Sequence, residues 1–127
     1  MAQQSEFVEF VIEQLAPIGE FRARAMFGGY GIYQDDTMFA IIVDDQLYFK
    51  ADDITCKEFT KRGLNPFTYA SRGKTVTMQY YEAPPEVFEE PDAMQHWAQQ
   101  AVKVALRTKR ERKSSDKRKS HSKKSRP

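Results

Sequence analysis

Two pairs of adjacent aspartates constrain the fold more than any other feature of this sequence. Asp35-Asp36 and Asp44-Asp45 are turn signals that separate three runs rich in β-forming residues. The three runs cover residues 21–33, 37–43 and 46–50. A two-residue connection joins antiparallel neighbours, because a parallel pair needs a crossover of about a dozen residues. The pattern therefore predicts an antiparallel meander and excludes a parallel sheet.

Three glycines interrupt the first run, at Gly28, Gly29 and Gly31. Glycines inside a strand pattern indicate a bulge or a close approach of two backbones. The alternative is a phosphate-binding loop. A dinucleotide fingerprint needs G-x-G-x-x-G between a strand and a helix, and a P-loop needs a lysine followed by Ser or Thr. The sequence has neither arrangement, so the glycines favour a structural role.

Helical patterns open and close the part of the chain that holds these strands. Apolar residues recur at helical spacing over residues 6–16, with Ser5 as the expected N-cap. A last helix follows Asp92 and is expected to end near Arg107. Asp92 with Gln95 three residues later matches a capping box at the start of this helix.

A shorter helix and further strands lie between these ends. Asp52 or Asp53 can cap a helix that Gly63 terminates. Residues 66–69 look extended, and residues 76–82 alternate in polarity as a strand does. Helices combined with an antiparallel sheet predict an α+β fold, a two-layer domain.

Charge divides the chain after residue 106. The last 21 residues hold 11 of the 20 Lys and Arg and only two acidic residues, a net charge of +9. The preceding residues hold the other nine basic residues and 16 acidic ones, a net charge of −7. We therefore expect a folded domain over residues 1–106 and a disordered tail rich in Lys, Arg and Ser over residues 107–127, because the tail has too few apolar residues to offset its ordering entropy.

The basic tail predicts a polyanionic partner, and nucleic acid is the commonest one. Its binding is expected to be largely independent of sequence, because contacts to phosphates position a protein without reading bases. A solubilising tail and a tail docked on the acidic body are the alternatives. The candidate nucleic-acid-binding residues are Arg107, Lys109, Arg110, Arg112, Lys113, Lys117, Arg118, Lys119, Lys123, Lys124 and Arg126.

Patterns for catalysis, metal binding or a cofactor are missing from the sequence. Cys56, His96 and His121 lack the spacing of a zinc site and match no Cys–His motif. The paired carboxylates fall at expected turns or helix starts, where Asp and Glu accept backbone hydrogen bonds. We expect no catalytic residue, no metal ligand and no cofactor.

Cysteine content and hydropathy indicate the compartment. One cysteine excludes an internal disulfide framework and fits a reducing environment. The N-terminus has no basic patch followed by an apolar run, and the longest apolar run, residues 38–43, is too short to span a bilayer. The expected location is the cytoplasm, away from membranes.

Several stretches match one known family in order and spacing. They are RAMFGGYGIY at residues 24–33, LYFKAD at residues 47–52, MQYYE at residues 78–82 and the last helix with Trp97. Over residues 6–106 the chain resembles the TfoX/Sxy family, in its N-terminal domain. Phe27, Gly28, Gly29 and Gly31 match the most recognisable motif of that family, for which no catalytic role is expected.

The resemblance implies an α+β domain with a curved antiparallel sheet, similar to secretion-chaperone-like folds, and it implies no enzyme. Founding members of the family are bacterial competence regulators that act with the cyclic-AMP receptor protein. Those regulators add a helical C-terminal domain, where this chain carries the basic tail.

These observations support two hypotheses. The first is a non-enzymatic transcriptional regulator or adaptor that contacts a transcription factor of the cyclic-AMP receptor protein type and binds nucleic acid through its tail. The second is a protein-interaction module, such as a homodimer, without a nucleic-acid role.

Overall fold

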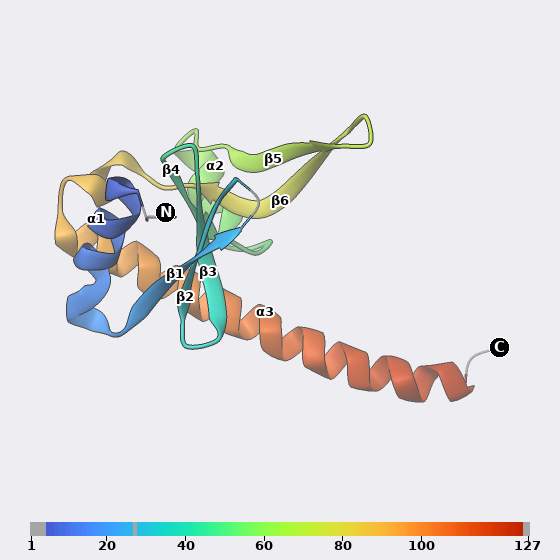
Figure 1. Cartoon of the computed structure of the whole chain (residues 1–127). Helices are drawn as coiled ribbons and strands as arrows, with labels where there is room; N and C mark the ends of the chain where they lie inside the picture. The colour runs from blue at the N-terminus through green and yellow to red at the C-terminus, as the bar shows by residue number, and fades with distance from the viewer. Residues whose placement is uncertain (1–4, 27, 126–127) are drawn as a thin grey trace.

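A computed structural model describes residues 5–26 and 28–125, with side chains described to residue 111 (Figure 1). The described residues form three α-helices, two short 3-10 helices and six strands. The helices are α1 (Glu6–Leu15), α2 (Cys56–Lys61) and α3 (Pro91–Ser125), with η1 (Ala16–Ile18) and η2 (Pro85–Phe88). The strands are β1 (Phe21–Met26), β2 (Gly29–Gln34), β3 (Thr37–Val43), β4 (Gln46–Lys50), β5 (Pro66–Ser71) and β6 (Lys74–Glu82).

All six strands join one antiparallel sheet in the order β1-β2-β3-β4-β6-β5. The predicted α+β class is confirmed, because α1 and the first half of α3 lie on one side of this sheet (Figure 1). The turns at Asp35, Asp44 and Asp45 have positive φ angles, as two-residue hairpin turns require. Aspartate tolerates this left-handed conformation better than most residues do, which explains why these pairs could be read as turns.

The prediction of one interrupted strand over residues 21–33 is wrong. The chain reverses direction there, and Met26 of β1 pairs with Gly29 of β2 in a tight hairpin. Gly28 makes the reversal feasible, because its φ angle of 67° is left-handed and costs glycine little. Phe27 lies outside the described residues.

Gly29 is the point where two backbones approach each other, as the glycine cluster predicted. A Cβ atom on Gly29 would lie 2.2 Å from the carbonyl oxygen of Ile42 on β3. The contact is to main chain, so a larger residue could be accommodated only by displacing one strand from the other.

The hydrophobic core lies between the helices and one face of the sheet. Phe39, Leu47 and Phe49 are fully buried on this face. Facing them, α3 contributes Met94 and small alanine side chains, which let the helix axis lie close to the strands. A register shift opposite Tyr33 places Met38 on the other face of the sheet and turns Phe39 into the core.

The two long helices begin differently. The Ser5 cap of α1 is confirmed, because the backbone N–H of Val8 donates to its Oγ at 3.1 Å. The capping box at Asp92 and Gln95 is wrong. Helix α3 begins at Pro91, so Asp92 lies inside its first turn and is not its N-cap. Proline is favoured at a first helical position because its missing N–H would be unpaired there. The Gln95 amide instead donates to the backbone oxygen of Gln14 at 3.1 Å and ties α3 to α1.

Helix α3 continues well beyond its expected end near Arg107, to Ser125 (Figure 1). The expectation was based on the loss of apolar residues, which removes tertiary packing. Helical hydrogen bonds do not need that packing, and lysine and arginine are good helix formers. No Gly or Pro interrupts residues 92–125. The division of the chain into a domain over residues 1–106 and a separate tail stays a prediction.

A comparison of two neighbouring glycines tests the close approach of β2 and β3. We expect Gly29→Ala to destabilise the protein by about 3 kcal/mol, because the added methyl group meets main chain. Gly28→Ala is expected to cost only about 1 kcal/mol, since a Cβ there meets no atom within 4 Å and only the φ angle is strained. Urea unfolding of both variants measures the difference, and equal losses would contradict this account of the strand contact.

Candidate nucleic-acid arm and its anchor

The basic part of α3 leaves the folded body at a sharp boundary. Val104 and Ala105 are buried, and Leu106 is the first exposed apolar residue after them. From Arg107 onward the described side chains are half-buried or exposed. Figure 1 shows the helix running on past the sheet, away from the other elements. We call the segment from Lys109 to the end of the helix the basic arm.

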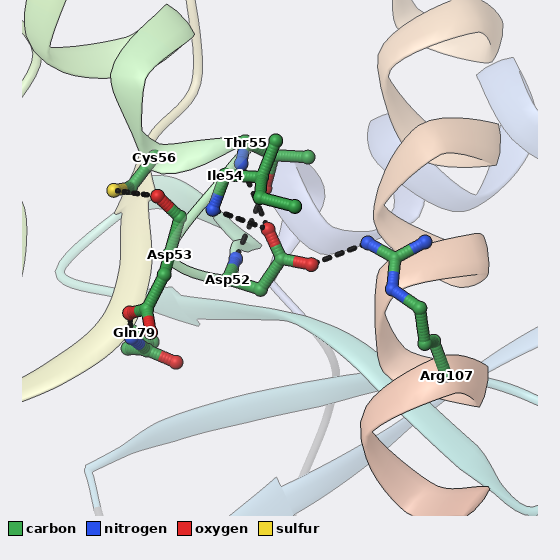
Figure 2. A network of polar contacts seen from close by, with 7 residues as sticks. All are labelled: Asp52, Asp53, Ile54, Thr55, Cys56, Gln79 and Arg107. Carbon is green, nitrogen blue, oxygen red and sulfur yellow. Dashed lines mark hydrogen bonds and ion pairs between the residues drawn. The ribbon is translucent and has the colours of Figure 1, made fainter. Parts of the chain in front are cut away.

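An ion pair anchors α3 at this boundary. The Arg107 guanidinium donates to Asp52 Oδ2, from the loop that connects β4 to α2 (Figure 2). The Asp52 side chain is 19% exposed and that of Arg107 is 43% exposed. The pair therefore lies at the edge of the body and connects α3 to the loop that follows β4.

Local hydrogen bonds hold Asp52 in place for this contact. Its Oδ1 accepts from the backbone N–H of Ile54 at 3.0 Å and of Thr55 at 2.8 Å. The Asp52 N–H in turn donates to the Thr55 hydroxyl at 3.0 Å. The backbone N–H of Cys56, at the start of α2, donates to the Asp52 carbonyl at 2.9 Å. Asp52 thus stabilises the turn that leads into α2, but the expectation that it caps the helix is wrong, because Thr55 is the N-cap residue of α2. One carboxylate contacts both this turn and α3 (Figure 2).

These contacts change the ionisation of the Asp52 carboxyl. Burial alone raises its pKa, but the hydrogen bonds from Thr55, Arg107 and Ile54 favour the charged form and outweigh it. The net effect lowers the pKa of Asp52 from an ordinary 3.8 to about 2. The same contact raises the pKa of Arg107. Asp52 is therefore ionised, and the pair intact, throughout the neutral range.

Arg107 differs from the other candidate nucleic-acid-binding residues because it takes part in the anchor. Its guanidinium has an intramolecular partner, which sequence reasoning missed because Asp52 lies far away in the chain. The Lys109 side chain is half-buried and that of Arg110 is exposed. The backbones at Arg112, Lys113, Lys117, Arg118, Lys119, Lys123 and Lys124 are helical, but their side chains lie outside the description, as does Arg126.

The glycine motif does not form an anion site in this fold. Gly28 occupies the hairpin turn, and Gly29 and Gly31 lie in β2. A Cβ on Gly31 would lie 2.6 Å from Met38 Sδ and 3.0 Å from Met26 Sδ. The glycine therefore makes room for two methionine side chains on the face of the sheet opposite the helices.

Residues considered for catalysis have structural partners. Cys56 Sγ donates to the Asp53 carbonyl at 3.4 Å, and the Asp53 carboxylate accepts from the Gln79 amide at 3.0 Å (Figure 2). His96 packs edge-on against Trp97 on α3. Within residues 5–26 and 28–111, whose side chains are described, no cluster of three or more His, Cys, Asp or Glu could hold a metal ion. Among the described helices none is both long and apolar enough to cross a membrane.

A cavity of about 590 Å³ lies between α2 and α3, another feature that the sequence did not reveal. Phe59 and Trp97 form its apolar wall, with ring centroids 5.3 Å apart. Arg62 lies over Trp97 and pairs with Glu86 at 2.9 Å, so its charge is already compensated. The cavity therefore offers no free cation to an anionic ligand from this arginine.

Comparisons with known proteins give consistent results. The profile of the TfoX N-terminal domain family matches residues 13–105. The chain is 29% identical to Protein Sxy of Escherichia coli (strain K12) over 97 residues, which are 76% of this chain and 46% of that protein. It is 28% identical to DNA transformation protein TfoX1 of Aliivibrio fischeri (strain ATCC 700601 / ES114) over 91 residues, 72% of this chain and 43% of that protein. The chain thus spans less than half the length of these relatives.

Substitution of Asp52 tests the anchor. We expect Asp52→Asn to destabilise the protein by about 1 to 2 kcal/mol at pH 7, because a charge-assisted hydrogen bond is lost while the size of the side chain is kept. The folded-state pKa is below the ordinary value, so the stabilisation is complete above pH 3.8 and is lost as the pH falls toward 2. Urea unfolding at several pH values measures both effects.

Asp53→Asn is the matched control, since the carboxylate of this neighbour accepts a hydrogen bond from Gln79 of β6, whereas that of Asp52 pairs with Arg107 of α3. It is expected to change stability by less than about 0.5 kcal/mol, as surface substitutions usually do. The anchor has no energetic role if both variants behave alike. Hydrogen exchange adds a local readout, because Asp52→Asn should increase exchange around Arg107 before it does so in β3.

Proposed function

Because the chain belongs to the TfoX N-terminal domain family, we propose that it is a non-enzymatic regulator of bacterial competence or a related transcriptional adaptor. In this proposal the folded body contacts a protein partner, and the basic arm binds nucleic acid without sequence preference. One of these relatives, from Aliivibrio fischeri, is named as a DNA transformation protein, which supports a regulatory role in that process.

The observation that carries the nucleic-acid part is the separation of charge along one helix. The first half of α3 is buried in a body of net charge −7, and the segment from residue 107 has a net charge of +9. The acidic body repels a phosphate backbone, so contact is favoured only where α3 extends away from it (Figure 1). The Asp52–Arg107 anchor supports this arrangement by holding α3 at the point of exit.

The partner of the body is proposed to be a transcription factor of the cyclic-AMP receptor protein type. The family membership supports this class of partner. A second candidate function is a protein-interaction module without a nucleic-acid role, as in a homodimer. An exposed apolar groove on the sheet, described below, favours protein contact in either case.

Salt dependence of DNA binding tests the basic arm. If about six of its charges neutralise phosphates, the logarithm of the binding constant should fall with the logarithm of salt concentration at a slope near −5. A full-length variant with glutamine at Lys109 and at every later lysine and arginine keeps Arg107 and the anchor. This variant should lose nearly all affinity for duplex DNA, measured by fluorescence anisotropy.

The control replaces two basic residues of the body, Arg72 and Lys74, with glutamine. These residues lie at the β5–β6 turn, and the slope should change by less than about one. The proposal for the arm fails if the neutralised variant binds DNA as tightly as the wild-type chain at low salt. Equal affinity for unrelated duplexes is expected, because the arm contacts phosphates alone.

A further inference from the structure

The sheet has a second face, which none of the described helices covers. Alternation along the strands places Met26 on this face, together with Ile41, Tyr48 and Met78. Their neighbours Ala23 and Leu47 belong to the helix-covered core. We call the uncovered side the open face.

A groove of about 550 Å³ occupies the middle of the open face. None of the residues that line it is charged. They include Met26, Met38, Ile41, Phe67, Tyr69 and Met78, which come from the two ends of the sheet and from its centre. The size is within the range of ligand-binding clefts, about 300 to 1,000 Å³. Three methionines give the groove an adaptable surface of the kind used to bind apolar side chains of other proteins.

The apolar side chains that line the groove are more exposed than those of a hydrophobic core. Met26 is 38% exposed and Tyr69 is 44% exposed, although both are large. Phe67 forms a wall between Tyr48, at a centroid distance of 5.2 Å, and Tyr69, at 6.1 Å. Contiguous exposed apolar surface of this kind marks interaction sites. The missing Cβ of Gly31 leaves room for the Met26 and Met38 side chains that line the groove, which gives the family motif a role there.

The opposite face of the sheet shows that helices can cover these strands. On the opposite face α1 and α3 pack with apolar stripes against the strands, as expected in layered domains. An added strand would pair at the edges, with β1 or β5, and would leave the groove uncovered. A helix with one apolar stripe matches the groove, since its side chains at helical spacing fill a channel between the strands.

Charge on the open face selects among helical partners. Arg22, Arg24 and Lys74 share this face by alternation. Glu82 also lies on it and, like Asp44, acts on Tyr48; the Glu82 carboxylate accepts from the Asn65 N–H at 3.1 Å. Arg24 belongs to β1 and Lys74 to β6, the strands that contribute Met26 and Met78 to the groove. The aspartates at the hairpin turns lie at the strand ends, and Asp36 already pairs with Arg22. A helix along the groove thus meets basic side chains that rise from the strands on both sides.

The same charges disfavour the two partners that the chain itself offers. A second copy that used the same face would bring the basic residues of one copy to a face that carries the same basic residues. The basic arm of another copy would bring its positive charge to a face that is already basic. A helix with carboxylates beside its apolar stripe has neither conflict and gains charge complementarity.

We propose that the open-face groove binds an amphipathic helix of a protein partner, with large apolar side chains on one stripe and carboxylates on its flanks. This inference rests on the proposed function and names the chemistry of the partner that the body contacts. The groove contributes the apolar contact, and the basic strand residues select acidic helices over basic ones.

The test uses two fluorescein-labelled peptides of 18 residues, with leucines on one helical face and alanines elsewhere. One peptide carries glutamates beside the leucines and its twin carries lysines. Anisotropy with the full-length protein should show the acidic peptide binding at least about tenfold more tightly than its twin at low salt. Tyr69→Ala should weaken binding of the acidic peptide about tenfold, because it removes an aromatic wall of the groove.

Ile54→Ala is the matched control, since Ile54 is a large apolar residue that is 73% exposed but lies beside α2, outside the groove. The affinity of the Ile54→Ala variant for the acidic peptide should stay within about twofold of that of the wild type. Arg24→Glu should reduce the preference for the acidic peptide without changing the unfolding midpoint. Urea unfolding of each variant shows that a loss of binding reflects the surface and not the fold.

Three results would overturn the proposal. The first is equal binding of the two peptides, and the second is an unchanged affinity in Tyr69→Ala. The third is evidence that something else occupies the groove. Such evidence would be a dimer, seen by sedimentation, that Tyr69→Ala dissociates, or displacement of the acidic peptide by an oligothymidylate. The variant with a neutralised arm should bind the acidic peptide normally, so failure of the groove can be told apart from failure of the DNA-binding proposal.

Discussion

The packing of the first half of α3 against the sheet is the contact on which the rest of the structure depends. Met94, Ala98 and Ala101 bury one stripe of the helix against the strands, and the Gln95 amide ties it to α1. The small alanines bring the helix close, so the burial of Phe39 and Phe49 depends on its position. Where the stripe ends at Ala105, the Arg107–Asp52 pair holds the helix at the edge of the body. The direction of the basic arm therefore follows from how the core is filled.

This arrangement gives one small domain the two separate surfaces for which we propose interactions. The two faces of the sheet differ. Helices cover one face, and the other has a groove lined by apolar side chains with basic residues beside it. The arm concentrates positive charge at a distance from the acidic helical layer. Both surfaces use binding chemistry, apolar contact and long-range charge, and neither needs a reactive group.

Much of the fold could be predicted from the sequence, because local signals agree with the tertiary structure. Alternating polarity, paired aspartates at turns and the Ser5 cap all act over a few residues. The β1–β2 hairpin was missed because Gly28 and Gly29 look alike in sequence, although one supplies a left-handed turn and the other a close strand contact. Contacts between distant residues left no local signal. Two such contacts join Asp52 with Arg107 and Phe67 with Tyr48. The anchor and the groove therefore could not be predicted from the sequence.

The central claim is that the body and the arm act as separate surfaces joined at Arg107. Backbone amide shifts of the ¹⁵N-labelled full-length protein, followed by NMR during a titration with duplex DNA, test it most directly. The account predicts that shifts beyond Arg107 change while those of β1 to β6 stay constant. Changes centred on the strands, with the arm unaffected, would contradict the account.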